Sequence, residues 1–173
     1  MDLHRTIPVL NEMERSGVIK RYAIGGAVAA FLYIEPGTTY DLDIFMAWEP
    51  SPSGLMTMEP IYSFLQGRGY KAGHEAVMIE GWPVQFLPPG TPLVEEALSQ
   101  SLAIELGGAP TRIFSKEHLM AICLETGRPK DYARLVQFVE EGSPDMSRFM
   151  DIVGRSGLLP KWERFRNRFL TPL

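Results

Sequence analysis

The first two thirds of the chain switch repeatedly between two hydrophobic patterns. Short apolar or alternating runs are typical of strands, whereas apolar residues three and four apart are typical of helices, and Gly and Pro between them supply turns. These patterns predict strands at residues 21–24, 39–48, 75–80 and 83–87, around Tyr70, and around Gly107 and Gly108. They predict helices at residues 6–16, 27–34, 58–66 and 91–100.

The last third of the chain has a different character, because helix follows helix. Ser115 is a favourable N-cap, and Glu117 in the first turn complements the helix dipole. The pattern predicts helices at residues 116–126, 130–141, 145–157 and 160–169. We therefore expect an α/β core over residues 1–114, with a helical subdomain over residues 115–173 packed on it as one compact unit.

The composition is that of an ordinary globular protein, with 45% hydrophobic residues among 173. The sequence has no run of eighteen apolar residues and no long apolar stretch at its N-terminus, so it predicts neither a membrane span nor a signal peptide. A single cysteine, Cys123, permits no internal disulfide and no cysteine cluster for zinc. A bacterial, cytoplasmic protein is the natural expectation.

The charge balance argues against general DNA binding. The net charge is −4, whereas phosphate-driven affinity depends on clustered Lys and Arg. One local exception is the stretch KWERFRNRF at residues 161–169, where four cations accompany an apolar stripe at helical spacing. Two interpretations stay open for it: the solvated face of an amphipathic helix, or a patch that faces RNA.

Two aspartates interrupt one of the predicted strands. Side chains two apart on a strand point to one face, so Asp41 and Asp43 would lie side by side, about 7 Å apart along the strand. Leu42 and Ile44 would anchor the opposite face in the core. Two carboxylates at this spacing suit one Mg²⁺ or Mn²⁺ ion, or a pair of such ions, which would also relieve their mutual repulsion.

Gly25 and Gly26 lie where a predicted strand turns into a predicted helix. Main-chain N–H groups without side chains can approach a phosphate there, and the start of a helix adds the positive end of its dipole. Together with the aspartates, this order predicts a phosphate cradle facing a metal site, which suits attack on the α-phosphate of a nucleotide. The alternative is a tight turn followed by two solvated aspartates.

These residues resemble motifs of the polymerase-beta-like nucleotidyltransferase superfamily, and especially of small bacterial proteins related to the toxins of type IV (abortive-infection) toxin–antitoxin systems. The likeness rests on Gly25-Gly26, fourteen residues, and Asp41-Leu42-Asp43 preceded by Thr39, and on a helix–turn–helix segment at residues 117–135. It implies a nucleotidyltransferase fold, with a short mixed sheet flanked by helices and a helical subdomain that closes the nucleotide cleft. It also implies an NTP donor, Mg²⁺ or Mn²⁺, an RNA or protein hydroxyl as acceptor, and an antitoxin protein as a candidate partner.

The same resemblance assigns nucleotide-binding roles to Thr39 and to the helix at residues 130–141. Lys130 would reach the triphosphate, and Asp131 would orient it or a neighbouring base. Lys130 and Arg134 lie one helical turn apart on one face. The alternative is an exposed helix start with an Asp131–Arg134 ion pair.

Active members of that superfamily usually carry a third carboxylate on a neighbouring strand, in a stretch like Val-Asp-Phe-Leu. The corresponding stretch here places Gln85 at that position, and Gln85 cannot deprotonate a hydroxyl. Glu80, on the other arm of the predicted hairpin, is an alternative third carboxylate. Two hypotheses follow. The first is Mg²⁺-dependent nucleotide transfer with Asp41, Asp43, Gln85 and Lys130 at the catalytic site, and the second is a protein of that fold that binds nucleotide or a partner without turnover.

Overall fold

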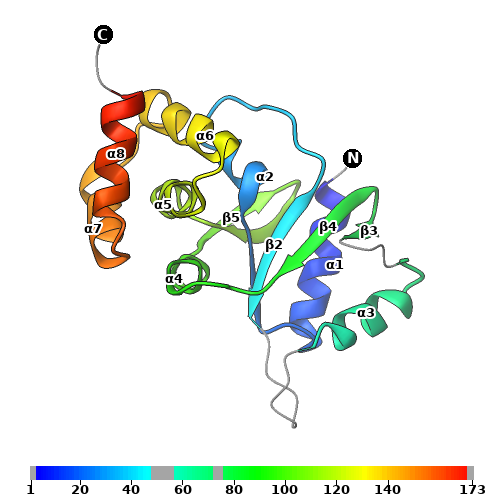
Figure 1. Cartoon of the computed structure of the whole chain (residues 1–173). Helices are drawn as coiled ribbons and strands as arrows, with labels where there is room; N and C mark the ends of the chain where they lie inside the picture. The colour runs from blue at the N-terminus through cyan, green and yellow to red at the C-terminus, as the bar shows by residue number, and fades with distance from the viewer. Residues whose placement is uncertain (1–2, 48–56, 72–75, 171–173) are drawn as a thin grey trace.

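The computed structural model describes residues 3–47, 57–71 and 76–170, and six strands of that part form one mixed sheet (Figure 1). The strands are β1 (Arg21–Ile24), β2 (Leu42–Ala47), β3 (Val77–Ile79), β4 (Trp82–Leu87), β5 (Leu102–Leu106) and β6 (Ala109–Ile113). Their order across the sheet is β3-β4-β2-β1-β6-β5. β2 runs parallel to β4 and antiparallel to β1, while β6 runs parallel to β1. β2 is therefore an inner strand with neighbours on both sides.

Eight helices are described around this sheet. They are α1 (Leu3–Arg15), α2 (Gly26–Ala30), α3 (Glu59–Gln66), α4 (Pro92–Ser99), α5 (Lys116–Thr126), α6 (Pro129–Glu140), α7 (Met146–Arg155) and α8 (Leu159–Phe169). Figure 1 shows α1 and α3 on one side of the sheet and α4 to α8 on the other. Among the described helices, none is long and apolar enough to cross a membrane.

The alternation of β2 decides what each face of the sheet carries. Leu42, Ile44 and Met46 are fully buried, so they belong to the core on the side of α1. Asp43 and Phe45 point to the opposite face, because side chains alternate along a strand. The face with Asp43 is the one that α5 and α6 border.

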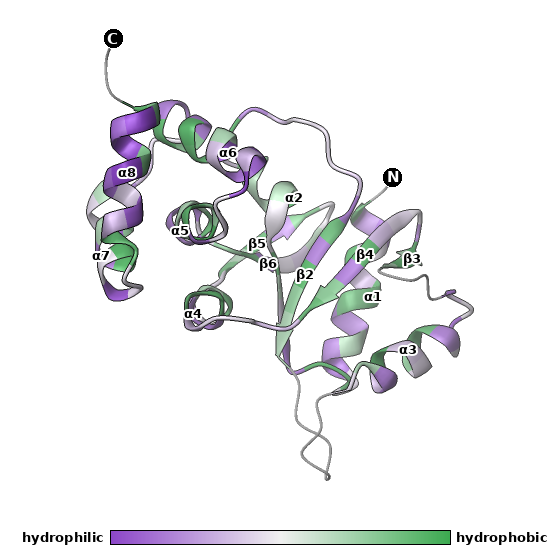
Figure 2. Ribbon diagram, viewed as in Figure 1, coloured by the Kyte–Doolittle hydropathy of each residue, from purple (hydrophilic) through white to green (hydrophobic). Residues whose placement is uncertain are grey.

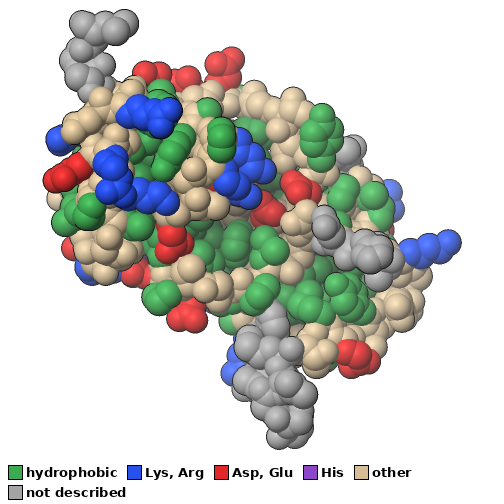
Figure 3. Space-filling view, viewed as in Figure 1, with side chains coloured by type: hydrophobic (Ala, Val, Ile, Leu, Met, Phe, Trp, Pro, Cys, Tyr) green, Lys and Arg blue, Asp and Glu red, His purple; other side chains and the backbone are tan. Residues whose placement is uncertain are grey.

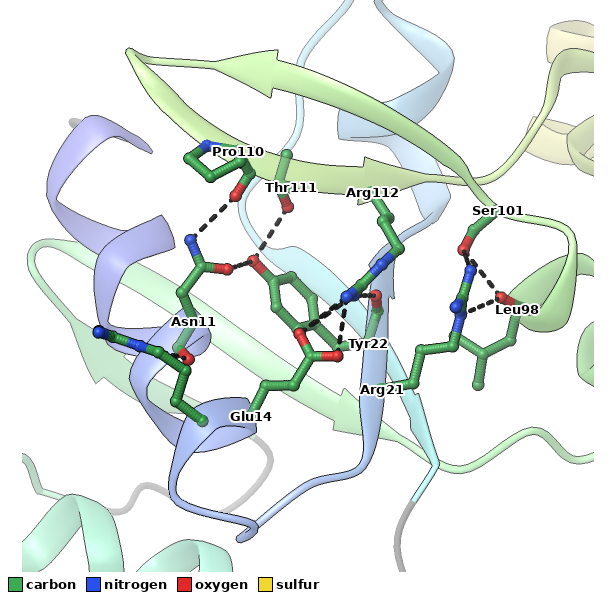
Figure 4. Close-up of polar contacts among 10 residues, drawn as sticks. Asn11, Glu14, Arg21, Tyr22, Leu98, Ser101, Pro110, Thr111 and Arg112 are labelled. Carbon is green, nitrogen blue, oxygen red and sulfur yellow. Dashed lines mark hydrogen bonds and ion pairs between the residues drawn. The ribbon is translucent and has the colours of Figure 1, made fainter.

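A closed network of hydrogen bonds fixes α1 against β1 and β6 (Figure 4). The Tyr22 hydroxyl donates to Oδ1 of Asn11 at 2.7 Å and accepts from Oγ1 of Thr111 at 3.0 Å. The guanidinium of Arg112 donates to both carboxylate oxygens of Glu14 and to the Tyr22 carbonyl. Each of these polar groups has a partner, so the network stabilises the attachment of α1 without leaving a buried group unsatisfied.

The C-terminal helices form a second layer whose centre is α5. Figure 2 shows α5 mainly hydrophobic, whereas α8, at the outer edge, is mainly hydrophilic. One cluster of buried side chains contains residues of the sheet and of α5 to α8. Packing is thus continuous across residue 114, and the division into a core over residues 1–114 and a subdomain over 115–173 stays a prediction.

The mixed α/β fold expected from the sequence is confirmed, but some predicted elements differ. Tyr70 lies in no strand, because its main-chain N–H donates to the Leu65 carbonyl just after α3. The helix predicted at residues 27–34 is shorter, since α2 has only five residues. Its continuation is a turn in which the N–H groups of Leu32 and Tyr33 bond three residues back.

The strand predicted at residues 39–48 is also shorter at its start. β2 begins at Leu42, so Asp41 lies immediately before the strand rather than within it. Trp48, at the other end of the predicted strand, lies outside the described residues.

Candidate functional site

A cavity of about 710 Å³ opens on the face of the sheet that carries Asp43. Its walls differ in chemistry. Carboxylate and amide side chains come from β2 and β4, cations come from the start of α6, and apolar side chains come from the sheet and α5. Figure 3 shows basic side chains over α8 and the start of α6, with acidic side chains beside them near the centre of this face.

Three of the residues predicted for catalysis lie side by side in this cavity. Asp43 pairs directly with Gln85 across the parallel strands β2 and β4. Nε2 of Gln85 donates a hydrogen bond of 2.9 Å to Oδ2 of Asp41. Oγ1 of Thr39 lies 3.3 Å from Oδ1 of the same aspartate and donates to it. The carboxylate of Asp41 is therefore held in place by two neutral donors.

Of the two aspartates, Asp43 is the one whose ionisation is disfavoured. Burial raises the pKa of its carboxyl above the usual value, and the negative charge of Asp41 raises it further. The positive charges of Lys130, Arg134 and Arg128 lower the pKa of Asp43 but do not cancel the rise. The ionised pair therefore lacks full compensation from the protein, and a bound cation would supply it.

Gly26 permits this arrangement, since a side chain there would occupy the place of the Asp43 carboxylate. A Cβ built on Gly26 would stand 1.7 Å from Oδ2 of Asp43. The residue also has a φ of +57°, which L side chains rarely adopt. A glycine is thus required here by contact and by backbone conformation alike.

The expectation for Gly25 needs correction. Its N–H donates to the main-chain carbonyl of Asp43 at 3.0 Å, so this amide is not free for a phosphate. A Cβ on Gly25 would instead collide with the ring of Phe45 at 2.5 Å. Of the two glycines, only Gly26 borders the cavity. The short α2 also gives little of the helix dipole that the sequence led us to expect.

Cations of α6 face the aspartates across the cavity. Lys130 and Arg134 both line it, as does Arg128 at the N-cap of the helix. Nε and Nη2 of Arg128 donate to the two carboxylate oxygens of Asp131, at 2.6 and 3.2 Å. Asp131 is only 2% exposed, so it acts as a buried support for the Arg128 guanidinium.

Asp131 also lines the cavity, and its contact with Arg128 is one that the sequence did not predict. The carboxylate of Asp131 pairs with Arg128 and not, as in the alternative, with Arg134. Sequence reasoning did not assign Arg128 to the site, although its position three residues before Asp131, at a helix start, is a usable signal for such a pair. Lys130, which the resemblance assigned to the triphosphate, lines the cavity.

An apolar wall completes the cavity. The rings of Phe45 and Phe114 lie 4.8 Å apart, and Leu119 of α5 borders the same space. Cys123 lines this wall too, and burial raises the pKa of its thiol to about 11, so it stays neutral. Tyr40, 76% exposed, borders the opening. A planar aromatic ligand could pack against the partly exposed ring of Phe45 while its charged part faces the cations.

Glu80, the alternative third carboxylate, does not line the cavity. It accepts a hydrogen bond from the Tyr70 hydroxyl at 2.8 Å and pairs with Arg5 at 2.6 Å. Within the described residues there is no group of three or more His, Cys, Asp or Glu side chains that could hold a metal. Asp41 and Asp43 nevertheless fit Mg²⁺ or Mn²⁺, because such ions are commonly held by one or two carboxylates together with water and substrate phosphates.

One comparison with solved structures supports the fold. No protein-family model and no curated protein sequence matches the chain. The crystal structure of an antigenic nucleotidyltransferase-like protein from Paracoccidioides brasiliensis superposes with a TM-score of 0.64 at 14% identity, covering 97% of this chain and 88% of that one. Two structures of ANT(2'')-Ia match less closely. Its complex with adenylyl-2''-tobramycin has a TM-score of 0.46 at 14% identity and 96% coverage of both chains. Its solution structure has a TM-score of 0.47 at 17% identity, covering 98% of this chain and 92% of that one.

Proposed function

We propose that this chain, which has the fold of the nucleotidyltransferases, transfers a nucleotide from an NTP to an acceptor hydroxyl with Mg²⁺ or Mn²⁺ as cofactor. The supporting observation is the cavity itself, in which two adjacent carboxylates face three cations of α6. A metal–triphosphate complex carries both charges that this arrangement lacks, a cation for the aspartates and an anion for the basic side chains.

The roles of the residues follow from their positions. Asp41, oriented by Thr39 and Gln85, and Asp43 would hold the metal ion, which supplies charge neutralisation at the reacting phosphate. Lys130 and Arg134 would bind the phosphates beyond the reacting one. Arg128, fixed by Asp131, would do the same from the N-cap of α6, because guanidinium groups suit phosphate oxygens.

The proposed reaction is a substitution at the α-phosphorus. The acceptor oxygen forms a new bond to phosphorus, the bond to the β-phosphate oxygen breaks, and pyrophosphate leaves. Gln85 occupies the place where a third carboxylate would accept the proton of the acceptor hydroxyl, and a neutral amide cannot take that proton. The proton would therefore pass to solvent, and we expect slow transfer.

A labelling experiment tests this proposal. Purified protein is incubated with each of the four NTPs labelled at the α-phosphate, with Mg²⁺ or Mn²⁺, and with total RNA and protein from a bacterial extract. We expect covalent label in one of these pools, dependent on the metal and absent with the Asp41→Asn/Asp43→Asn variant. If neither wild type nor a Gln85→Asp variant labels any acceptor, the transfer proposal is wrong.

Gln85 favours a second function, which is binding of a metal–nucleotide complex without turnover. In that case the cavity would hold the NTP as a ligand that stabilises one conformation or one complex. Nucleotide binding would then depend on Asp41 and Asp43 as before, but label would never become covalent. The same labelling experiment, run beside a binding measurement, separates the two functions.

The sequence resemblance extends the proposal to a biological setting. A toxin of a type IV system, acting in the bacterial cytoplasm on RNA or protein, would slow growth when expressed without its antitoxin. Growth after induction of wild type and of Asp41→Asn/Asp43→Asn tests this setting. Equal growth of the two strains, at equal protein levels, would contradict a toxin role and leave the chemistry to be judged by the labelling experiment.

A further inference from the structure

The exposed side of α8 is strongly basic, against the charge of the chain as a whole. The whole sequence has 17 basic and 21 acidic residues, whereas α8 carries four Lys or Arg and a single Glu. Lys161, Arg164 and Arg168 recur at spacings of three and four, which places them along one side of the helix. Within the described residues, Arg164 makes no ion pair or side-chain hydrogen bond, so its charge faces solvent.

An accessible aromatic ring lies at the end of this basic row. Phe169 is 40% exposed, although it also packs against Tyr132 with ring centroids 5.5 Å apart. The guanidinium of Arg168 lies 5.0 Å from the same ring. An aromatic ring flanked by arginines is the combination that binds unpaired nucleic-acid strands, because bases stack on the ring while phosphates pair with the cations.

The basic row leads towards the cavity. Nζ of Lys161 donates to the Glu125 carbonyl at 2.6 Å, at the end of α5. Arg128, three residues after Glu125 along the chain, lines the cavity. Figure 3 shows the basic side chains over α8 and those at the start of α6 on the same face of the molecule. A polyanion on α8 would therefore extend to the cavity opening.

We infer that the basic row of α8, with Phe169, binds a single-stranded nucleic-acid segment and so presents a strand end as the acceptor at the cavity. The acceptor part of this inference rests on the proposed nucleotide transfer, whereas the binding part does not. An anionic membrane fits the surface less well. Trp162 and Phe165 are only 5% and 2% exposed, and the exposed apolar residues Leu159 and Phe169 lie at opposite ends of α8, so the helix presents no continuous apolar stripe that could insert.

Binding of fluorescein-labelled 12-nucleotide single strands, one of RNA and one of DNA, tests the inference by fluorescence anisotropy across a salt series. We expect wild type to bind, and Arg164→Gln/Arg168→Gln to bind about 10- to 30-fold more weakly at 0.1 M salt, with a salt slope reduced by about 1.4. Phe169→Leu, which keeps an apolar contact with Tyr132, should weaken binding about fivefold or more through lost stacking.

The matched control is Arg15→Gln/Lys71→Gln, which removes the same two charges at exposed positions near α1 and α3. This control should leave binding unchanged, and melting curves of all variants check that they fold. The inference is wrong if wild type binds neither strand, or if the control weakens binding as much as the α8 variant. Binding to vesicles of phosphatidylcholine and phosphatidylserine that depends on Arg164 and Arg168, without strand binding, would also overturn it.

Nucleotide binding by wild type is measured separately, as Mg²⁺-dependent stabilisation by NTP. Strand binding without that stabilisation would contradict the proposed function and leave the α8 surface in place. Stabilisation without strand binding would contradict the inference alone. RNA bound much more tightly than DNA would identify a ribonucleotide strand as the acceptor class.

Discussion

Two polar clusters lie on opposite sides of the central sheet, and they are built on different principles. The cluster under α1 is closed: the Tyr22 hydroxyl and the Arg112 guanidinium each find partners within the protein. The cluster in the cavity is open: Asp43 lies beside another carboxylate, and its pKa is raised by burial and by that neighbour. Both clusters use charged and hydroxyl side chains, so composition alone does not separate them.

The difference shows which region of the molecule lowers the stability of the folded state. A satisfied network contributes to folding, whereas adjacent carboxylates in a partly buried site oppose it unless a ligand compensates them. An ionisable group with a perturbed pKa in a cleft is a candidate for a functional site for that reason. We therefore assign the cavity to ligand chemistry and the network under α1 to the fold.

Gln85→Asp should have the largest effect. It adds the missing carboxylate beside Asp43, and a positioned base is typically worth about 10²–10⁴-fold in rate. We expect nucleotide transfer with Mg²⁺ or Mn²⁺ to rise by that order, measured by incorporation of α-labelled NTP. Gln85→Asn is the matched control, because it stays neutral and should not raise the rate. An unchanged rate in Gln85→Asp, with robust transfer by wild type, would show that the amide is the functional group at this position.

Tyr22→Phe tests the closed cluster. It leaves Oδ1 of Asn11 without its donor and the buried hydroxyl of Thr111 without its acceptor, which should cost about 1–3 kcal/mol of unfolding free energy. At about 2–4 °C for each kcal/mol, the melting temperature should fall clearly. The stabilisation gained from Mg²⁺ and NTP should not change. A loss of nucleotide binding at full stability would mean that the two clusters are coupled.

Asp43→Asn should have the smallest effect, and in the opposite direction. A carboxyl whose pKa is raised in the folded state destabilises the fold once it ionises, so removing its charge should raise the melting temperature of the metal-free protein at pH 7 by about 2 °C or more. The cost disappears at low pH, where the carboxyl is protonated in both states. The advantage of Asp43→Asn should therefore shrink as the pH falls towards the ordinary pKa of 3.8. If the melting temperature of Asp43→Asn exceeds that of wild type by the same amount at every pH, the stabilisation comes from packing and not from the loss of charge.

The side-by-side placement of Asp43 and Gln85 could be predicted because it depends on local rules. Strand alternation places residues two apart on one face, and the family resemblance identified the neighbouring strand. The structure then pairs Asp43 with Gln85 in register. The alternation also predicted which side chains of β2 would be buried.

Other parts of the site depend on contacts that no local pattern encodes. The need for glycine at position 26 arises from Asp43, a residue 17 positions later whose carboxylate fills the space of a side chain. The bond from Gly25 to the Asp43 carbonyl removed an amide that the sequence had offered to a phosphate. The sequence did not show that Glu80 lies away from the site either, because its partners, Arg5 of α1 and Tyr70 after α3, lie in other parts of the chain.

The central claim is that Asp41 and Asp43 bind a metal–nucleotide complex, and thermal unfolding with and without Mg²⁺ and NTP tests it most directly. At a ligand concentration of about 100 times Kd, binding to the native state contributes about 2.7 kcal/mol, which should raise the wild-type melting temperature by about 5–10 °C. Asp41→Asn/Asp43→Asn should lose the Mg²⁺-dependent part while remaining folded, and Glu105→Gln/Glu140→Gln, with two exposed carboxylates neutralised, should keep it. If the aspartate variant keeps the full shift, the two aspartates are not the metal site and the claim is contradicted.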